Sequence, residues 1–318
     1  MPRRRRIPPP GWRGALYRAS GGLIRVRASA AQARRQDLIS RARTPVAAGH
    51  YRIAVLSLKG GVGKTTVTMG LGSTLAAMRG DRIIAVDASP DRGTLSERLM
   101  PQTTATVRDL LAARDRIHRY ADVRRFTSQA PSRLEVLASA QDPAASVAYS
   151  EQDYRDTCAV LERFYSICLT DCGTGLLHSA MAGVLQLADQ IVLVTTSSVD
   201  GARSADACLD WLAAHGRHDL AANAVVAVTA TRRHRRAGID TSVLTRHFSS
   251  RCRAVVLVPY DPYLAQGAEA DLDQLGKPTA GAFLGLAATV GDGFSARRPE
   301  HPVLPALIAT DPAASYDS

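Results

Sequence analysis

Residues 57–66, SLKGGVGKTT, bring together the side-chain types that bind a phosphate group. The glycines of this stretch allow backbone N–H groups to curl around an anion without side-chain clashes. Lys64 adds a compact positive charge, and the hydroxyl of Thr65 is a hard oxygen ligand of the kind that Mg²⁺ prefers. The common pattern of such a loop, G-x-x-x-x-G-K-[ST], begins with glycine, but that position is Leu58 here, and a second lysine, Lys59, follows it. The stretch predicts a phosphate loop with one lysine more than the loop itself needs.

Two aspartates, Asp87 and Asp171, each end a short apolar run, IIAVD and ICLTD. A nucleotide-bound Mg²⁺ usually also depends on a carboxylate at a neighbouring strand end. Helix capping is the structural alternative for each aspartate, because an unpaired acid would be costly to bury at the end of an apolar strand. We expect Thr65, Asp87 and Asp171 to form a metal site.

Apolar runs of strand length alternate with helix-forming segments, which predicts an α/β fold: a doubly wound, mostly parallel sheet with helices on both faces. The predicted strands cover residues 52–58, 82–89, 134–139, 165–171, 190–196, 224–230 and 254–261. The predicted helices cover residues 66–79, 107–113, 154–164, a segment ending near 187, 202–215 and 280–290. Ligands of such sheets bind beyond the carboxyl ends of the strands, so the loops after these strands should form the site.

The net charge of +11 belongs to the first 50 residues, which hold twelve arginines and a single acid, Asp37. Residues 51–318 hold 28 basic and 28 acidic side chains, so the rest of the chain is balanced in charge. We therefore expect three parts. They are a basic, Pro/Arg-rich and disordered tail (1–50), a globular domain (51–293) and a loose C-terminal tail (294–318). Within the first tail, residues 27–43 have helical propensity and an arginine-rich face, and we expect them to become ordered only on binding.

Composition also bears on the compartment. No apolar run approaches the roughly 18 residues needed to span a bilayer, and no apolar segment follows the N-terminal arginines as in a secretory signal. Five scattered cysteines without a C-x-x-C pair argue against a disulfide framework and against a structural zinc. The expectation is a cytoplasmic protein whose thiols are buried.

The string KGGVGKTT resembles the deviant Walker A motif of the MinD/ParA ATPases, which are P-loop NTPases of the SIMIBI type. The resemblance implies ATP and Mg²⁺ as cofactors, and it identifies Lys59 as the signature lysine that contacts the partner's phosphates in an ATP-bound homodimer. By the same resemblance, Thr65 is a Mg²⁺ ligand and Asp171 is the Walker B acid. The implied catalytic residues are Lys59, Lys64, Asp87 and Asp91. The implied nucleotide contacts of the loop are Lys59, Gly60, Gly61, Val62, Gly63, Lys64, Thr65 and Thr66.

The sequence departs from the family pattern in three places. In 87-DASPDRGTL-95, Ser89 replaces the usual second aspartate, so hydrolysis is expected to be slow or to depend on a partner, with Asp91 as a substitute. The asparagine that the family often uses to contact adenine is also missing after residues 224–230. The adenine contacts are therefore assigned to Thr231, Pro259, Tyr260 and Asp261. Finally, the C-terminus does not resemble the basic amphipathic membrane helix that ends MinD.

The strings VDASPDRGTLSERL and LTDCGTGLLHSAMAGVLQLADQ also resemble the EspI-like ATPases of actinobacterial type VII secretion loci. The function that this implies is an ATP-dependent dimerising switch that regulates or positions a protein partner such as a secretion system. One alternative is a nucleoid-associated partition ATPase, because the arginine-rich residues 1–50 suit phosphate contacts with DNA or with an anionic membrane. Another alternative, which Ser89 favours, is an ATP-binding regulator that does not hydrolyse ATP. The expected location is cytoplasmic or peripheral at the membrane or nucleoid.

Overall fold

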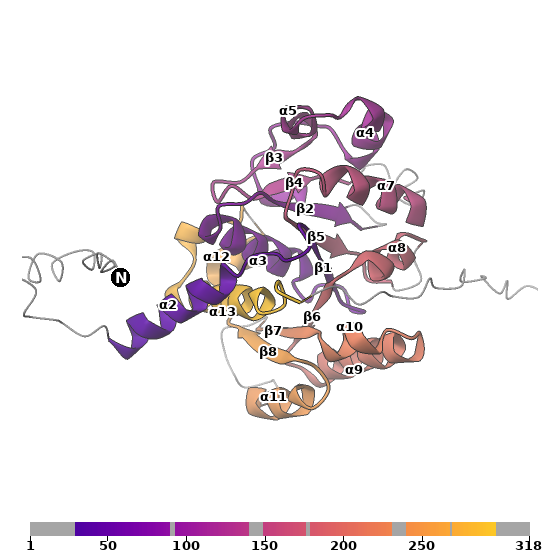
Figure 1. The fold of residues 1–318 in the computed structure, drawn as a ribbon. Coiled ribbons are helices and arrows are strands. Elements are labelled where there is room, and N and C mark those ends of the chain that lie inside the picture. The colour runs from indigo at the N-terminus through magenta and orange to yellow at the C-terminus, as the bar shows by residue number, and fades with distance from the viewer. Residues whose placement is uncertain are drawn as a thin grey trace, which may run out of the picture.

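The computed structural model describes residues 29–89, 93–139, 149–175, 179–230, 240–267 and 269–296. Within these residues, eight strands form one sheet in the order β3-β4-β2-β5-β1-β6-β7-β8 (Figure 1). All neighbouring pairs are parallel except β3–β4, which confirms the predicted fold class. The strands are β1 (Tyr51–Leu56), β2 (Ile83–Ala88), β3 (Ser128–Gln129), β4 (Glu135–Leu137), β5 (Ile167–Cys172), β6 (Gln190–Thr196), β7 (Val225–Thr229) and β8 (Ala254–Val258).

Helices cover both faces of this sheet. The helices are α2 (Ala30–Ala42), α3 (Lys64–Met78), α4 (Val107–Ala112), α5 (Tyr120–Val123), α7 (Glu151–Leu161), α8 (Ser179–Leu187), α9 (Val199–Ala214), α10 (His218–Ala222), α11 (Thr241–Ser249), α12 (Pro262–Ala265) and α13 (Lys277–Gly291). Short 3₁₀ turns occupy Ser96–Arg98, Arg114–Arg116, Arg124–Phe126 and Leu272–Gln274. Helices α2, α3 and α13 lie on one face, and α4, α7, α8, α9, α10 and α11 lie on the other.

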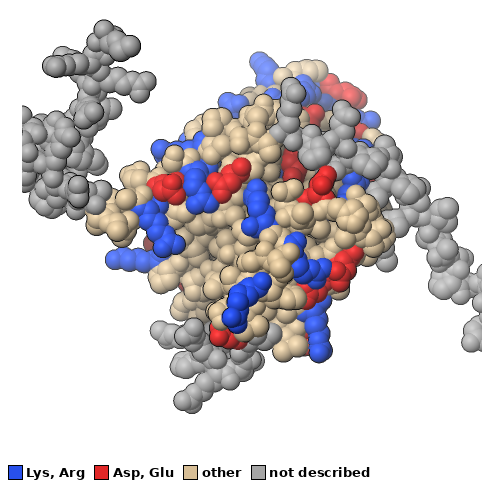
Figure 2. Space-filling view, turned by 60° about the horizontal axis from the view of Figure 1, so that its bottom comes forward, with Lys and Arg blue, Asp and Glu red and all other residues tan. Residues whose placement is uncertain are grey.

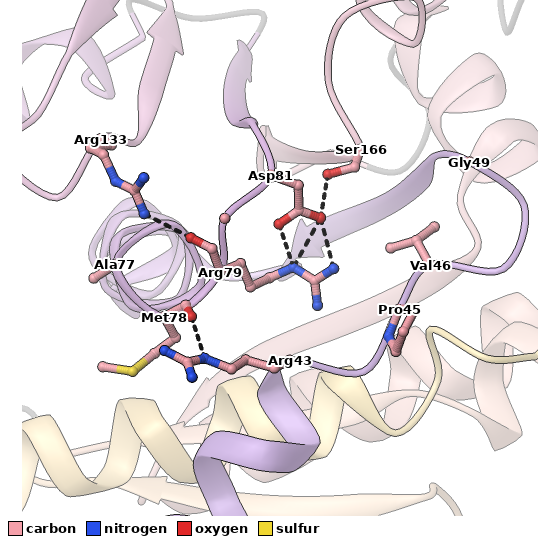
Figure 3. A pocket seen from close by; sticks show the side chains of 11 residues that line it. Arg43, Pro45, Val46, Gly49, Ala77, Met78, Arg79, Asp81, Arg133 and Ser166 are labelled. Atoms are coloured by element: carbon pink, nitrogen blue, oxygen red, sulfur yellow. Dashed lines mark hydrogen bonds and ion pairs between the residues drawn. The ribbon is translucent and has the colours of Figure 1, made fainter. Parts of the chain in front are cut away.

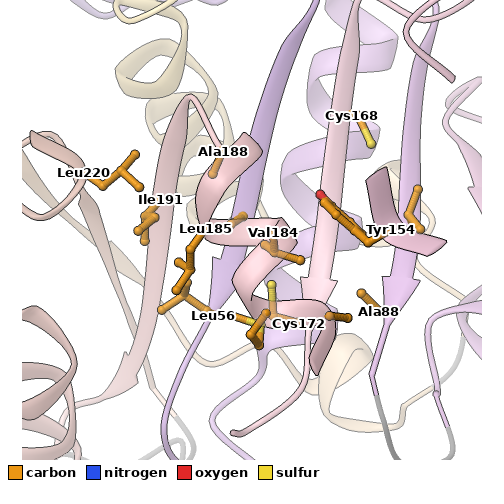
Figure 4. Close-up of a cluster of buried hydrophobic side chains, with 14 of the residues drawn as sticks. Leu56, Ala88, Tyr154, Cys168, Cys172, Val184, Leu185, Ala188, Ile191 and Leu220 are labelled. Carbon is orange, nitrogen blue, oxygen red and sulfur yellow. The ribbon is translucent and has the colours of Figure 1, made fainter. Parts of the chain in front are cut away.

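Each face buries its own hydrophobic cluster, because successive strand residues point to opposite sides of a sheet. In β1, Ile53 and Val55 pack toward α3 and α13, whereas Ala54 and Leu56 pack toward α8 and α9. Figure 4 shows part of this second cluster, where Leu56 lies beside the side chains of α8. The alternation fixes which face each side chain points to. Because β4, β2, β5, β1, β6, β7 and β8 are parallel, the loops at their carboxyl ends meet at one edge of the sheet.

Helix α2 lies within residues 27–43, the segment of the expected tail to which the sequence assigns helical propensity. Its last turn packs against α13, where Ala42 is fully buried. Arg41 donates two hydrogen bonds to the carboxylate of Asp292, at 2.6 and 3.0 Å. Arg79, at the end of α3, donates to the carbonyl of Ala42 at 2.9 Å. These contacts hold the C-terminal half of α2 to the domain, while its first two turns remain exposed.

Several short elements escape sequence-based prediction. Strand β3 has only two residues, and helices α10 and α12 have five and four, so each is too short to give a periodic pattern. Phe294, which was assigned to the expected C-terminal tail, is buried and contacts Tyr51 edge-on, with ring centroids 4.9 Å apart. Residues 1–28 and 297–318 lie outside the described residues.

Two further observations concern the helices and the cysteines. Among the residues that the structure describes, no helix has both the length and the apolar character needed to cross a bilayer. All five cysteines are buried and carry free thiols.

Candidate nucleotide-binding site

The phosphate loop, residues 59–66, connects the end of β1 to the first turn of α3. Gly61 and Gly63 have φ values of 71° and 93°, in the left-handed region where a side chain would be strained. The loop is anchored by Thr229 at the end of β7, whose hydroxyl donates to the carbonyl of Val62 at 2.7 Å. Because Gly63 is the N-cap of the 15-residue helix α3, the positive end of the helix dipole faces this loop. The arrangement is suited to hold an anion.

Thr65, at the start of α3, is in direct contact with Asp171, near the end of β5. The hydroxyl of Thr65 donates to one carboxylate oxygen at 2.7 Å, and the hydroxyl of Thr68 donates to the other at 3.3 Å. The residue directly opposite Asp171 in β2 is Asp87, and both aspartates are only 1% exposed. The structure therefore brings the three residues predicted for the metal site to one corner of the sheet edge.

Burial raises the pKa of both carboxylates. For Asp171 the negative charge of Asp87 adds to the effect of burial, whereas Thr65 and Lys64 act in the opposite direction. For Asp87, backbone N–H groups that donate to the carboxylate partly offset burial. Two adjacent buried acids beside a hydroxyl form a set of hard oxygens, and a divalent cation would stabilise their charged forms. The donor set thus fits Mg²⁺.

Asp87 also closes the loop that follows β2. Its carboxylate accepts hydrogen bonds from the backbone N–H groups of Ser89 and Leu95, each at 3.1 Å, and so holds both ends of residues 89–95. Ser89, at the position where the family has its second aspartate, is half-buried. Asp91 lies in residues 90–92, outside the described part of the chain, so its proposed catalytic role stays a prediction.

The side chain of Lys59 is exposed rather than enclosed by the loop. Its ammonium group lies 3.8 Å from the carboxylate of Asp200, in the first turn of α9, and 46% of the side chain is exposed. Val199, next to Asp200, is an apolar residue with 51% exposure. The extra lysine therefore stands on the surface beside an exposed apolar side chain, where a second molecule can reach it.

A pocket of about 270 Å³ lies between the phosphate loop and the segment after β8. Pro259, Tyr260 and Asp261, which were predicted to contact adenine, line it together with residues of the loop. The carboxylate of Asp261 accepts hydrogen bonds from the backbone N–H groups of Tyr263 and Gly276, each at 3.0 Å. Asp261 thus fixes the wall of the pocket by capping α12 and tethering the start of α13.

Three residues of this site were missed by sequence reasoning. Thr68 follows Lys64 by one helical turn, so helical spacing alone could have placed it beside the loop. Thr229 and Asp200 carry no local signal, because their partners lie far away in the chain. Thr231, the remaining predicted adenine contact, falls in residues 231–239, outside the described residues.

A parallel α/β sheet with a glycine-rich loop between its central strand and a following helix, and with acids at neighbouring strand ends, defines a P-loop nucleotide-binding fold. Comparisons with known proteins agree with this fold. A family profile described as an AAA domain matches residues 51–208. The ESX-1 secretion-associated protein EspI of Mycobacterium tuberculosis, in strains CDC 1551 and H37Rv, is 40% identical over 251 residues. That match covers 77% of this chain but only 37% of each EspI protein.

Solved structures give the same result at lower identity. A ParA family ATPase from Chlorobium tepidum superposes with a TM-score of 0.61 at 20% identity, covering 74% of this chain and 98% of that one. The cell division ATPase MinD of Pyrococcus furiosus superposes with a TM-score of 0.58 at 25% identity, covering 76% and 98%. The chain belongs to the MinD/ParA-like family and is related to EspI.

Proposed function

We propose that this protein is an ATP-dependent switch of the MinD/ParA type, in which Mg²⁺–ATP bound at the phosphate loop joins two copies into a homodimer. The observation that carries the proposal is the position of Lys59: a second loop lysine, exposed beside Asp200 and Val199. A lysine in that position is free to complete the site of another subunit, as a charge supplied in trans does in other phosphoryl-transfer enzymes. Residues 51–293 form the proposed ATPase domain, with α2 attached to it.

Each part of the loop has a role in this proposal. The N-terminus of α3, Lys64 and the loop N–H groups bind and orient the phosphates. Thr65, Asp171 and Asp87 would hold Mg²⁺, which when bound neutralises phosphate charge. Relatives support these cofactors: MinD from Pyrococcus horikoshii was solved with Mg-ADP, and an McdA variant from Cyanothece with ATP. Because Ser89 lacks the carboxylate of the usual second aspartate, we propose slow or partner-stimulated hydrolysis.

The partner is proposed from the relatives. EspI is described as ESX-1 secretion-associated, which makes the machinery of a type VII secretion system the leading candidate. The chain spans little more than a third of the length of these curated relatives, so this assignment is a proposal for the part that is shared. The switch would act in the cytoplasm or at the cytoplasmic side of a membrane.

Molar-mass measurement during size-exclusion chromatography tests the switch, with Mg²⁺ and either ATP or ADP present. Wild type should be dimeric with ATP and monomeric with ADP. Lys59→Ala should stay monomeric with ATP while still binding the nucleotide, and Lys64→Ala should lose nucleotide binding. Lys277→Ala, which removes the third lysine of the chain, is the matched control and should behave as wild type. A Lys59→Ala variant that dimerises as well as wild type would refute the proposal.

DNA or anionic-membrane contact through residues 1–50 is the second candidate. The exposed first turns of α2 carry Arg34 and Arg35, and they continue the arginine-rich sequence of residues 1–28. On the face shown in Figure 2, by contrast, basic and acidic side chains are interspersed. Deletion of residues 1–28 together with Arg34→Gln and Arg35→Gln should abolish salt-dependent retention on DNA or on anionic vesicles, because counterion release supplies most of such binding. Unchanged retention would remove this candidate.

A further inference from the structure

A second pocket lies at the end of α3 that is farthest from the phosphate loop, and Figure 3 shows it at close range. Its walls come from the last turn of α3, the segment between α2 and β1, and residues just before β2, β4 and β5; we name it the distal pocket. Its volume is about 650 Å³, inside the range of roughly 300–1,000 Å³ that is usual for ligand pockets. At 1.5 Å per residue, α3 separates it from the loop by roughly 22 Å.

The lining of the distal pocket combines positive charge with an apolar wall. Three arginines, Arg43, Arg79 and Arg133, face a single acid, Asp81. The carboxylate of Asp81 is already occupied by Arg79 and by the hydroxyl of Ser166 at 2.6 Å. Apolar groups complete the lining, namely Pro45, Val46, Ala77 and Met78. The side chains left to meet a ligand are therefore basic or apolar.

The three guanidinium groups differ in how many of their N–H groups already donate hydrogen bonds within the protein. Arg79 is 7% exposed and bonds Asp81 and two main-chain carbonyls, so it builds the wall. Arg43 is exposed and uses Nε toward the carbonyl of Met78, at 2.5 Å. Arg133 is also exposed and uses one terminal nitrogen, which donates to the carbonyls of Ala76 and Arg79 at 2.7 Å. Arg43 and Arg133 thus each keep solvent-accessible N–H groups at the pocket.

Arg133 occupies a backbone position that normally suits glycine. Its φ is 74°, in the turn between β3 and β4. Among the residues that the structure describes, it is the one non-glycine residue with positive φ. An arginine there costs conformational energy that glycine would avoid, so a gain from the side chain is expected to offset it.

Capping the C-terminus of α3 explains part of this arrangement, because arginines commonly donate to the last carbonyls of a helix. The partial negative charge of a helix end amounts to about half an elementary charge, and three guanidinium groups against one carboxylate exceed it. Capping also leaves the apolar wall and the open volume unexplained. The pocket therefore retains a net positive charge beside an apolar surface.

From these observations we infer that the distal pocket binds an anionic oxygen group, a carboxylate or a phosphate, carried on a partly apolar molecule. The free N–H groups of Arg43 and Arg133 would pair with the anion, since guanidinium groups match both carboxylate and phosphate geometry. Val46 and Met78 would pack against the apolar part of the ligand. This inference does not depend on nucleotide binding at the phosphate loop.

Met78 supplies a local probe for this inference. The full chain has five methionines, which can be labelled with methyl-¹³C methionine. The NMR signal of Met78 is assigned by its loss in the variant Met78→Leu. Phenyl phosphate and phenylacetate are then titrated, with neutral phenylacetamide as control. We expect a saturable shift of the Met78 signal with at least one of the anions, while the signals of Met69 and Met181 stay in place. The anion that binds more tightly identifies whether the natural ligand carries a phosphate or a carboxylate.

Two variants make the test specific. Arg133→Gly suits the positive φ, so it should fold normally, and Arg43→Gln keeps a polar side chain of similar reach. Each should weaken binding by about tenfold, the usual effect of losing one charge-assisted pair. An absent Met78 shift with both anions overturns the inference. An equal shift with phenylacetamide overturns it too, as does binding that the Arg133→Gly and Arg43→Gln double variant leaves unchanged.

Discussion

The ammonium group of Lys59 lies 3.8 Å from the carboxylate of Asp200 in the same chain. The side chains of this pair are 46% and 76% exposed, and an ion pair of that kind contributes less than about 1 kcal/mol. The extra lysine of the phosphate loop is thus held weakly within the monomer, and it can exchange Asp200 for the phosphate of a second subunit at little cost.

Asp200→Asn should therefore favour the ATP-bound dimer. Release of Lys59 from Asp200 is expected to lower the dimer dissociation constant by up to about fivefold for each of the two subunits, or about 25-fold in all, the limit that two surface pairs allow. Analytical ultracentrifugation with Mg²⁺–ATP measures the constant. The substitution should have no effect in a Lys59→Ala background, and a similar effect in both backgrounds would mean that Asp200 acts independently of Lys59.

Thr65→Ala should impair hydrolysis and raise the Mg²⁺ concentration needed for it, because it removes the hydroxyl that contacts Asp171. A loss of at least tenfold in rate is expected, roughly the value of one well-placed ligand to the metal and phosphates. Thr65→Ser keeps the hydroxyl and is the matched control. If the two variants hydrolyse ATP at equal rates across a Mg²⁺ titration, the hydroxyl has no such role.

Ser89→Asp should increase the rate of ATP hydrolysis, by about tenfold or more, because it restores a carboxylate that can position the attacking water. Ser89→Ala should hydrolyse ATP at the wild-type rate. Single-turnover hydrolysis of labelled ATP measures the rates of wild type, Ser89→Asp and Ser89→Ala. The rate of Lys64→Ala gives the baseline without catalysis. A wild-type rate no higher than that of Lys64→Ala would favour the regulator that does not hydrolyse ATP.

Asp261→Asn should destabilise the domain at neutral pH but not in acid. Burial alone would raise the pKa of Asp261, yet hydrogen bonds from Thr279, Gly276 and Tyr263 lower it below its ordinary value. A depressed pKa means that the charged form stabilises the fold above the ordinary pKa, and that this stabilisation is lost as pH falls through the lowered value. At pH 7 the variant should lose about 1–2 kcal/mol, the usual worth of hydrogen bonds to a charged group.

Thermal unfolding at pH 7 and near pH 2 measures this difference, which should shrink at the lower pH because the pKa of Asp261 lies below its ordinary value. Asp115→Asn is the control, because that side chain is 95% exposed. If Asp261→Asn and wild type differ in stability by the same amount at both pH values, the charge of Asp261 does not stabilise the loop.

Gly291→Ala should loosen α2 from the domain. A Cβ atom at residue 291 would lie 2.3 Å from the carbonyl oxygen of Arg41 and 3.0 Å from Cα of Ala42, so the two helices must separate. Close packing of this kind makes added volume cost about 1–3 kcal/mol. Gly285→Ala, on the same helix with no atom within 4 Å of the added Cβ, should instead be neutral or slightly stabilising.

Thermal unfolding and hydrogen exchange of residues 38–43 report both variants. Faster exchange at these residues in Gly291→Ala, but not in Gly285→Ala, is the expected result. Equal exchange in the two variants would mean that α2 does not depend on this helix contact.

The fold class and the phosphate loop could both be predicted from the amino-acid sequence. Both depend on patterns that are local: strand-length apolar runs fix the parallel sheet, and eight consecutive residues carry the loop chemistry. Asp87 and Asp171 could also be placed in advance, because parallel strands bring their carboxyl ends to one edge of the sheet.

The contacts between distant side chains could not be predicted in this way, because they depend on how the elements pack. The hydroxyl of Thr229 reaches the loop from 167 positions away, and no pattern near either residue indicates that contact. The same holds for the packing of helix α2: the sequence indicates helical propensity there, but not the contacts with Asp292 and with the end of α3. The distal pocket likewise exists only because these distant segments converge. Contacts of this kind depend on packing between elements, which local sequence patterns do not encode.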